Sequence, residues 1–255
     1  MADFQVDRVL LTNDDGIDAP GIRLLEEAAT TLAREVWVVA PEHDQSGVSH
    51  SISLHHPLRV SKRTARKVAV TGTPADCVAL AVQELMRDHP PDFIFSGINR
   101  GSNLGVETVF SGTVGAAMAG LLLGFRSIAL SQVFTNPNPV RWETGAALAP
   151  RVLRQLIAME WPEGCCMNVN FPDFPAAENT PIVFTEQGPG LMEGLSMNKR
   201  ADPRAVDYYW LTIRRNTARH NPEGTETAVV QKGGVSITPL QFERTNVEAL
   251  SALRR

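Results

Sequence analysis

The first half of the chain alternates between short apolar runs and segments with helical periodicity, and this rhythm restricts the possible folds more than any other feature. Apolar runs with the length of buried strands recur at 8–12, 35–41, 67–72, 92–97 and 126–132. Helical patterns follow Pro20 and Pro74, where a proline suits the first turn of a helix. Strands and helices in this order predict an α/β fold with a mostly parallel, doubly wound sheet and helices on both faces.

The pattern changes after residue 132. A helical pattern occupies 142–158, and a strand-like run ending in a turn follows at 165–173. Two later β-like segments, at 207–215 and 233–240, look more like a hairpin or arm than like core sheet. We therefore expect residues 1–132 to form the α/β core, and residues 133–255 to complete it and carry a β extension within one domain.

Composition excludes several classes of protein. The formal net charge of −4 provides no broad basic surface, so a nucleic-acid polymer is not an expected partner, although small anions can still bind locally. The three cysteines form no C-x-x-C pair, which favours a reducing compartment. The N-terminal MADFQVDRVLL lacks a basic region followed by an apolar stretch, so we expect a cytoplasmic protein.

One uncharged segment, 108–125, is long enough to raise the question of a membrane span. Its first part consists mostly of small or hydroxylated residues, and only LLLGF is strongly apolar. A helix packed tightly inside an α/β protein explains this composition better, so no membrane partner is expected.

Polar loops follow several of the predicted strands. In an open parallel sheet, ligands bind outside the carboxyl ends of the strands, so these loops are expected to meet at one edge. The loops are NDDG after the first strand, APEHDQSGVSHS after the second, SGINRGSNLG after 92–96, and SGT at the start of the next helix.

The adjacent carboxylates of Asp14 and Asp15 repel each other, and a bound divalent cation would relieve that repulsion. Ser46 and Asn99 can complete a shell made only of oxygen ligands, which favours Mg²⁺ or Mn²⁺ over zinc. The alternative is that Asp-Asp-Gly makes a β-turn that needs no metal. Four converging loops favour the metal.

The SGT sequence at 111–113 allows two interpretations. Ser111 or Thr113 can simply be the N-cap of the helix. The same geometry also suits phosphate, because the free N–H groups of Gly112 and Thr113, two hydroxyls and the helix dipole all favour an anion. His43 and His50 flank the Ser46 loop and can either reach a substrate or lie in solvent.

Motifs of other enzyme classes are missing from the sequence. There is no G-x-S-x-G and no G-x-x-x-x-G-K-[ST], and no G-x-G-x-x-G follows the first strand. Serine-hydrolase, P-loop and dinucleotide-binding interpretations therefore lose their usual support.

Seven motifs, in order and spanning nearly the whole chain, resemble those of the SurE-type 5′/3′-nucleotidase family. They are LLTNDDGIDAPGI, VVAPEHDQSGVSHSISL, GTPADCVALA, SGINRGSNLG, FSGTVGAAMAG, MNVNFP and GVSITPL. The resemblance implies a Rossmann-like α/β domain whose C-terminal β extension exchanges between subunits, giving a homodimer or homotetramer. It also implies a metal-dependent phosphatase acting on nucleoside 5′- and 3′-monophosphates and, in some members, on short polyphosphate.

The resemblance assigns roles by position. It implies that one divalent metal ion per subunit, Mg²⁺ or Mn²⁺, is held by Asp14, Asp15, Ser46 and Asn99. The positions where the family gathers phosphate are Asn103, Ser111, Gly112 and Thr113. Three positions depart from the family pattern, which usually has Tyr, Glu and Gly there: Phe110, Ala119 and Ala205.

The expected mechanism is attack by a water molecule. Phosphate monoesters hydrolyse so slowly that catalysis must lower the barrier by about 20 kcal/mol or more. Asp14 and Asp15 are the candidate catalytic residues, one of which would orient or deprotonate the water, and the sequence does not distinguish between them. The rival interpretation is a non-enzymatic metal- and nucleotide-binding sensor. A weaker one makes the aromatic residues at 208–210 a base-stacking platform rather than a packing surface.

Overall fold

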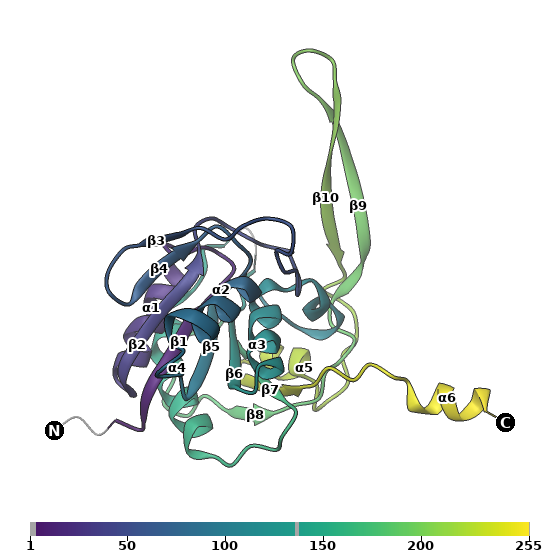
Figure 1. Ribbon diagram of the computed structural model, residues 1–255. Coiled ribbons are helices and arrows are strands. Elements are labelled where there is room, and N and C mark those ends of the chain that lie inside the picture. Colours follow the sequence, from purple (N-terminus) through teal and green to yellow (C-terminus); the bar gives the residue numbers. More distant parts are fainter. Residues whose placement is uncertain (1–3, 136–137, 255) are drawn as a thin grey trace.

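A nine-stranded sheet forms the centre of the computed structural model, which describes residues 4–135 and 138–254 (Figure 1). The strand order across the sheet is β3-β4-β2-β1-β5-β6-β7-β11-β8. Six neighbouring strands run parallel to one another: β1 (Val6–Thr12), β2 (Ala33–Pro41), β4 (Lys67–Val70), β5 (Phe93–Arg100), β6 (Arg126–Gln132) and β7 (Cys166–Phe171).

The remaining strands close the two ends of the sheet. β3 (Val60–Lys62) pairs antiparallel with β4. β11 (Val235–Leu240) pairs antiparallel with β7, and β8 (Ile182–Phe184) runs parallel to β11. Strands from both halves of the chain therefore share one sheet.

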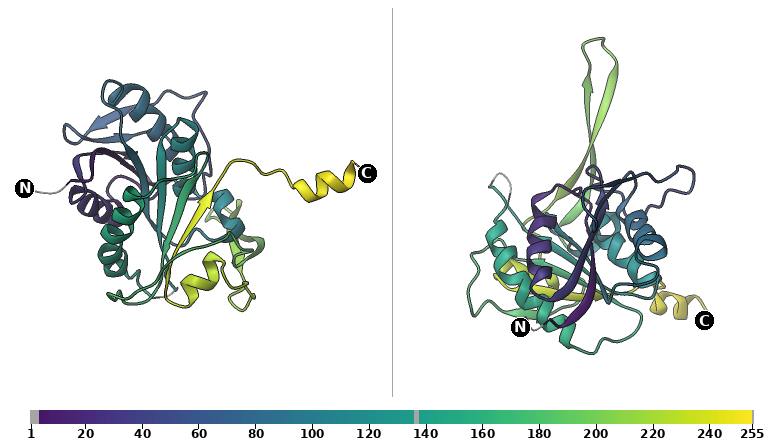
Figure 2. Two further views of the ribbon diagram at one scale, coloured as in Figure 1. Left: turned by 90° about the horizontal axis from the view of Figure 1, so that it is seen from below. Right: turned by 60° about the vertical axis from the view of Figure 1, so that its left-hand side comes forward.

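Helices cover both faces of the sheet (Figure 2). α1 (Pro20–Thr30) and α4 (Trp142–Ala158) pack on one face, and α2 (Pro74–Leu80) and α3 (Gly112–Leu122) pack on the other. A short π-helix, η1 (Ala81–Leu85), extends α2, and a 3₁₀ segment, η2 (Gly105–Phe110), precedes α3. The predicted doubly wound α/β fold is confirmed.

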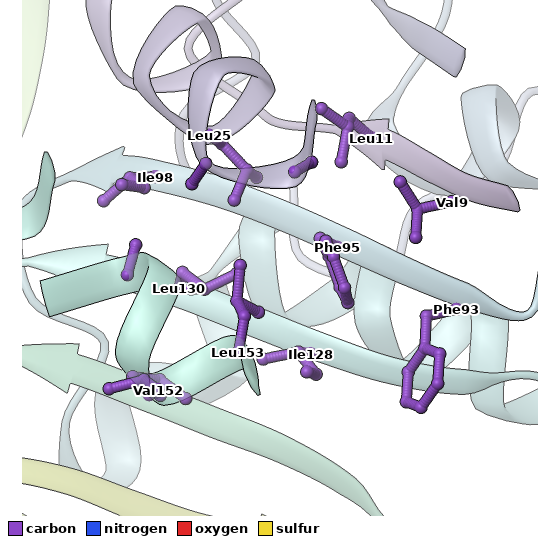
Figure 3. Packing of buried hydrophobic residues seen from close by; sticks show 14 of the residues in the cluster. Val9, Leu11, Leu25, Phe93, Phe95, Ile98, Ile128, Leu130, Val152 and Leu153 are labelled. Carbon is purple, nitrogen blue, oxygen red and sulfur yellow. The ribbon is translucent and has the colours of Figure 1, made fainter. Parts of the chain in front are cut away.

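The apolar runs of the sequence supply two separate cores. Successive residues of a strand point to opposite faces, so Val9 and Leu11 pack toward α1 and α4, whereas Leu10 packs toward α2. Figure 3 shows the first of these cores, where Phe95 and Leu130 lie near Leu153 of α4. Burial on both faces explains why the central strands have continuous apolar sequences rather than alternating ones.

The C-terminal half contains an arm that the sequence predicted only in part. β9 (Met192–Ala201) and β10 (Asp207–Arg215) form a separate antiparallel ribbon that projects from the body (Figure 1). The expectation of an arm strand at 207–215 is confirmed. The same expectation for 233–240 is wrong, because β11 lies within the core sheet between β7 and β8.

Two short helices complete the fold. α5 (Glu226–Gln231) precedes β11, and α6 (Val247–Leu253) ends an extended tail that leaves the body, with none of its residues buried (Figure 1). The uncharged segment at 108–125 contains α3, most of whose residues are buried against the sheet. Across residues 4–135 and 138–254, no helix has both the length and the apolar character needed to cross a bilayer.

Candidate metal and phosphate site

The first loop turns sharply after β1 and buries an aspartate. The amide nitrogen of Asn13 donates to the carbonyl oxygen of Gly16 at 2.8 Å, and Gly16 has a φ of +98°, which favours glycine. Asp14 is only 4% exposed inside this turn. The Asp-Asp-Gly turn therefore exists, and it places a carboxylate in the interior, which a purely solvated turn would not do.

The start of α3 packs directly on Asp14. The Thr113 hydroxyl donates to Asp14 Oδ1 at 2.6 Å, although the two residues are 99 positions apart. A Cβ on Gly112 would lie 2.8 Å from the Asp14 Cβ, so a side chain larger than that of glycine has no room there. The SGT sequence and the first aspartate are thus parts of one arrangement.

The loop after β2 lies over the same place. The Gln45 N–H donates to the carbonyl oxygen of Asp14 at 2.7 Å, and the Ser46 N–H donates to Asp44 Oδ1 at 2.7 Å. Further along, the Ser49 N–H donates to the carbonyl oxygen of Phe110 at 3.1 Å. The loop that carries Ser46 is therefore fixed between the first aspartate and η2, with Ser46 itself exposed.

Asn99 approaches the site from the end of β5. The N–H of the next residue, Arg100, donates to Asp15 Oδ2 at 2.9 Å. The side-chain nitrogen of Asn99 donates to the carbonyl oxygen of Gly101 at 3.0 Å, which leaves its oxygen for another partner. The four loops that the sequence predicted to converge do meet at the carboxyl ends of β1, β2 and β5.

Burial disfavours the negative charge of the site, and Arg100 offsets part of this effect at Asp15. Burial raises the pKa of Asp14 to about 6, against the hydrogen bond from Thr113, and the neighbouring Asp15 adds to the rise. Burial also raises the pKa of Asp15, and Asp44 contributes to that rise. In the part of the chain that the structure describes, neither Asp14 nor Asp15 forms a salt bridge.

The donor set fits a hard divalent cation. No three His, Cys, Asp or Glu side chains among the described residues gather where they could hold a metal ion, so the two aspartates need neutral partners. Ser46 and Asn99 offer hydroxyl and amide oxygens on the adjoining loops. Carboxylate, amide and hydroxyl oxygens without nitrogen or sulfur ligands match the preference of Mg²⁺ or Mn²⁺.

The N-terminus of α3 has both of the properties that its sequence allowed. Ser111 is the N-cap, because its Oγ accepts a hydrogen bond from the Val114 N–H at 3.0 Å. The hydroxyl proton of Ser111 remains available, whereas that of Thr113 is committed to Asp14. The N–H groups of Gly112 and Thr113, at the first positions of the helix, have no acceptor within it and can bind an anion. The Thr113 N–H also stabilises the ionised Asp14 carboxylate and so lowers its pKa.

Asn103 is buried in the loop that follows β5. It is 6% exposed, and its side-chain nitrogen donates to Ser131 Oγ at 2.8 Å. Its backbone bonds to Asn168 and Asn170 of β7. Sequence reasoning missed Ser131, Asn168 and Asn170, although the alternation of polar and apolar residues in MNVNF was a usable signal.

The two loop histidines have separate surroundings. His43 is exposed, and the ring of His50 lies 3.1 Å from the Ser49 hydroxyl, which itself donates to the carbonyl oxygen of Val109. Neither histidine hydrogen-bonds to Asp14 or Asp15.

Comparison with known proteins identifies the family. The family model described as Survival protein SurE matches residues 9–193. The chain belongs to the SurE family. The 5′-nucleotidase SurE 1 of Burkholderia lata is 55% identical over 97% of this chain and 95% of that protein. The 5′-nucleotidase SurE of Paramagnetospirillum magneticum is 47% identical over 96% of this chain and 94% of that protein.

A solved SurE structure has the same fold. The crystal structure of the SurE protein from Aquifex aeolicus superposes with a TM-score of 0.82 at 36% identity and covers 97% of this chain and 98% of that one. Of the three departures from the SurE pattern, Phe110 is 38% exposed and Ala119 is partly buried against the core beside α2. Ala205, in the turn between β9 and β10, has a φ of +61°, a conformation that glycine adopts more readily.

Proposed function

We propose that this SurE-family protein is a divalent-metal-dependent phosphatase of nucleoside monophosphates. The relatives that it matches over nearly their whole length are named 5′-nucleotidases. This supports removal of phosphate from nucleoside 5′-monophosphates. We propose nucleoside 3′-monophosphates and short polyphosphate as further substrates. The observation that carries the proposal is a buried Asp14 that packs against the N-terminus of α3 and forms no salt bridge with any described residue.

One Mg²⁺ or Mn²⁺ ion per subunit would be held by the aspartates of the first loop together with Ser46 and Asn99. When bound there, such an ion would supply Lewis acidity toward a phosphoryl oxygen and toward the attacking water. The protein prepares the ligands: Thr113 orients Asp14 through a 2.6 Å hydrogen bond, and the Arg100 N–H holds one oxygen of Asp15. Each carboxylate keeps its other oxygen for the cation.

The phosphate group would lie at the N-terminus of α3. The N–H groups of Gly112 and Thr113 and the positive end of the helix dipole neutralise charge on its oxygens, and the Ser111 hydroxyl can donate to one of them. An amide group offers two protons, so Asn103 can donate to phosphate while it also bonds to Ser131. The catalytic role of Asp14 or Asp15 is to orient or deprotonate the attacking water.

Cellular setting and assembly follow as further parts of the proposal. We place the protein in the cytoplasm as a homodimer or homotetramer whose contacts include the arm of β9 and β10, where large apolar side chains are exposed. Nucleoside monophosphates are the proposed small-molecule partners, and neither nucleic-acid polymers nor membranes are.

A substrate panel tests the proposed function. Phosphate release is measured, with Mn²⁺ or Mg²⁺ present, from 5′- and 3′-nucleoside monophosphates, p-nitrophenyl phosphate and tripolyphosphate. The proposal predicts release from the 5′-nucleotides and the chromogenic ester, and weaker release from the others. A folded protein that binds nucleotide and metal but releases no phosphate would instead be the non-enzymatic sensor. The presence of all four oxygen donors argues against that alternative.

A further inference from the structure

The strand β7 has an unusual distribution of polar residues. Its apolar residues Met167, Val169 and Phe171 pack in the core with α4, as expected for a central strand. The alternate positions, Asn168 and Asn170, are 1% and 0% exposed on the opposite face. Burying an amide side chain is unfavourable unless it is hydrogen-bonded, so two such residues in one strand need an explanation.

These asparagines belong to a polar row that crosses the sheet. Residues opposite one another in register share a face, and the register aligns Asn99 of β5 with Ser131 of β6, Ser131 with Asn170, and Asn170 with Ser236 of β11. Asn99, at one end of the row, is a proposed metal ligand. The other three are fully buried. The row thus runs from the candidate site into the interior.

The peptide of Asn103 lies on this row and is held by it. The Asn103 N–H donates to Asn170 Oδ1 at 2.9 Å. The Asn103 carbonyl oxygen accepts from Asn168 Nδ2 at 2.8 Å and from Asn170 Nδ2 at 3.1 Å. Ser131 accepts the hydrogen bond from the Asn103 side chain at 2.8 Å. Three side chains from two adjacent strands therefore fix the backbone and the amide of a single loop residue.

The loop needs external support because its own sequence is permissive. Gly101 has a φ of +124° and Gly105 one of +57°, so the residues on both sides of Asn103 have wide conformational freedom. The loop is anchored again at its far end, where the Gly105 N–H donates to Glu226 Oε1 at 2.6 Å. Between the two glycines, Asn103 is the residue that side chains of the sheet hold by hydrogen bonds, as far as the described residues show.

From this geometry we infer that Asn170, supported by Asn168 and Ser131, is a positioning residue that sets Asn103 for phosphate. The inference rests on the proposed function, in which Asn103 contacts the phosphate group. Asn170 reaches phosphate only through Asn103, so it acts on substrate affinity and not on the metal. Replacing Asn170 should displace the Asn103 loop slightly and leave Asp14 and Asp15 in place.

The test replaces Asn170, Asn168 and Ser131, which together form the clamp on Asn103, and compares these variants with a matched control. Asn170→Leu removes both hydrogen bonds and keeps the same branched heavy-atom skeleton, Asn168→Ala removes one, and Ser131→Ala frees the Asn103 amide. Ser236→Ala is the control, because Ser236 lies in the same row and is equally buried, but its hydroxyl has no hydrogen-bond partner among the described residues. The measurements are KM and kcat for a nucleoside monophosphate, the Kd values of inorganic phosphate and Mn²⁺, and amide exchange at Asn103.

Asn170→Leu should raise KM and the Kd of phosphate by about 10-fold to 100-fold, since small displacements of a binding group have effects of this order. Asn168→Ala and Ser131→Ala should have smaller effects in the same direction, with Mn²⁺ affinity unchanged in all three. Amide exchange at Asn103 should become faster in Asn170→Leu. Ser236→Ala should behave like the unaltered protein.

Two results would overturn the inference. The first is that Asn170→Leu loses thermal stability but keeps the phosphate affinity of Ser236→Ala, which would make the asparagines structural only. The second is a loss of Mn²⁺ affinity equal to the loss of phosphate affinity. If Asn170→Leu does not fold, Asn168→Ala and Ser131→Ala decide by the same criteria. A protein that releases no phosphate from any ester would refute the proposed function instead. The Kd of inorganic phosphate and amide exchange at Asn103 would still show whether Asn170 positions Asn103.

Discussion

Folding buries the carboxylate of Asp14, and no cationic side chain among residues 4–135 and 138–254 forms a salt bridge with it. Burial raises its pKa from 3.8 to about 6, so at neutral pH the metal-free protein folds with an ionised group in its interior. An acid whose pKa is higher in the folded state loses stability as pH rises between the two values, here from about 4 to about 6. Above that window the cost is constant, at roughly 3 kcal/mol for a rise of about two pKa units.

The first prediction is that Asp14→Asn makes the metal-free protein more stable while abolishing activity. In EDTA at pH 7.5 the variant should gain about 1–3 kcal/mol in the free energy of unfolding, because no charge is buried. Near pH 4 the two proteins should be equally stable, since Asp14 is then protonated. Urea unfolding at both pH values measures the difference. A variant less stable at pH 7.5, or one with normal turnover, would contradict the role given to Asp14.

The second prediction concerns the hydroxyl of Thr113, which donates to Asp14 at 2.6 Å. Thr113→Val removes the donor at nearly constant volume, and we expect the Kd of Mn²⁺ to rise about 10-fold to 100-fold, the usual effect of losing a partner that orients a metal ligand. Thr113→Ser keeps the hydroxyl and should bind Mn²⁺ almost normally. Equal affinities for the two variants, measured by calorimetry, would show that Thr113 does not orient Asp14.

Sequence reasoning identified candidate residues better than it identified the contacts between them. The adjacent aspartates and the SGT sequence are visible as local patterns. The Thr113–Asp14 hydrogen bond joins residues 99 positions apart, and no local pattern encodes it. It also changes the expected use of Thr113, whose hydroxyl proton goes to Asp14 and not to phosphate. The roles of all these residues in binding and catalysis remain predictions.

Among the elements, the strands of the first half could be predicted and those of the second half only in part. β11 reads Val-Ser-Ile-Thr, an alternation equally typical of a half-buried arm strand. Its polar residues are nevertheless buried, Ser236 in the row beside β7 and Thr238 bonded to Thr185, which only the sheet order reveals. β9 was missed because its sequence, MEGLSMNKRA, contains a glycine and few apolar residues.

The third prediction concerns the turn of the arm. Ala205 has a φ of +61°, and its N–H donates to the carbonyl oxygen of Asp202 at 2.9 Å. Ala205→Gly should relieve the left-handed strain, a gain of about 0.5–1 kcal/mol for the hairpin after the entropy of glycine is offset. Amide exchange in β9 and β10 should then be about twofold to fivefold slower. Ala201→Gly, in regular strand, should speed it, and faster exchange in Ala205→Gly would refute the strain.

The whole molecule exposes an apolar surface on a projecting ribbon. Large apolar side chains of the arm are more than half exposed: Met197 at 65%, Trp210 at 64%, Tyr209 at 58% and Leu211 at 56%. Exposed apolar surface of this kind marks a contact with another protein more often than a base-stacking platform. The arm projects from the body, so a second copy of the chain can cover it (Figure 1).

The fourth prediction is that the arm holds the subunits together. Leu211→Asp places a charge on the exposed face of β10 and should reduce the mass measured by light scattering to that of a smaller assembly or a monomer. Lys199→Gln, also in the arm, removes a surface ion pair with Asp207 and should leave the mass unchanged. An unaltered mass for Leu211→Asp would place the subunit contacts elsewhere.

The central claim, that the carboxyl edge of this sheet is a metal-dependent phosphatase site, is tested most directly by one experiment. Phosphate release from a nucleoside 5′-monophosphate is measured after EDTA treatment and again after Mn²⁺ is added back, with Asp14→Asn alongside. The account predicts activity that disappears with EDTA, returns with Mn²⁺, and never appears in the variant. Full activity in EDTA, or in Asp14→Asn, would contradict it.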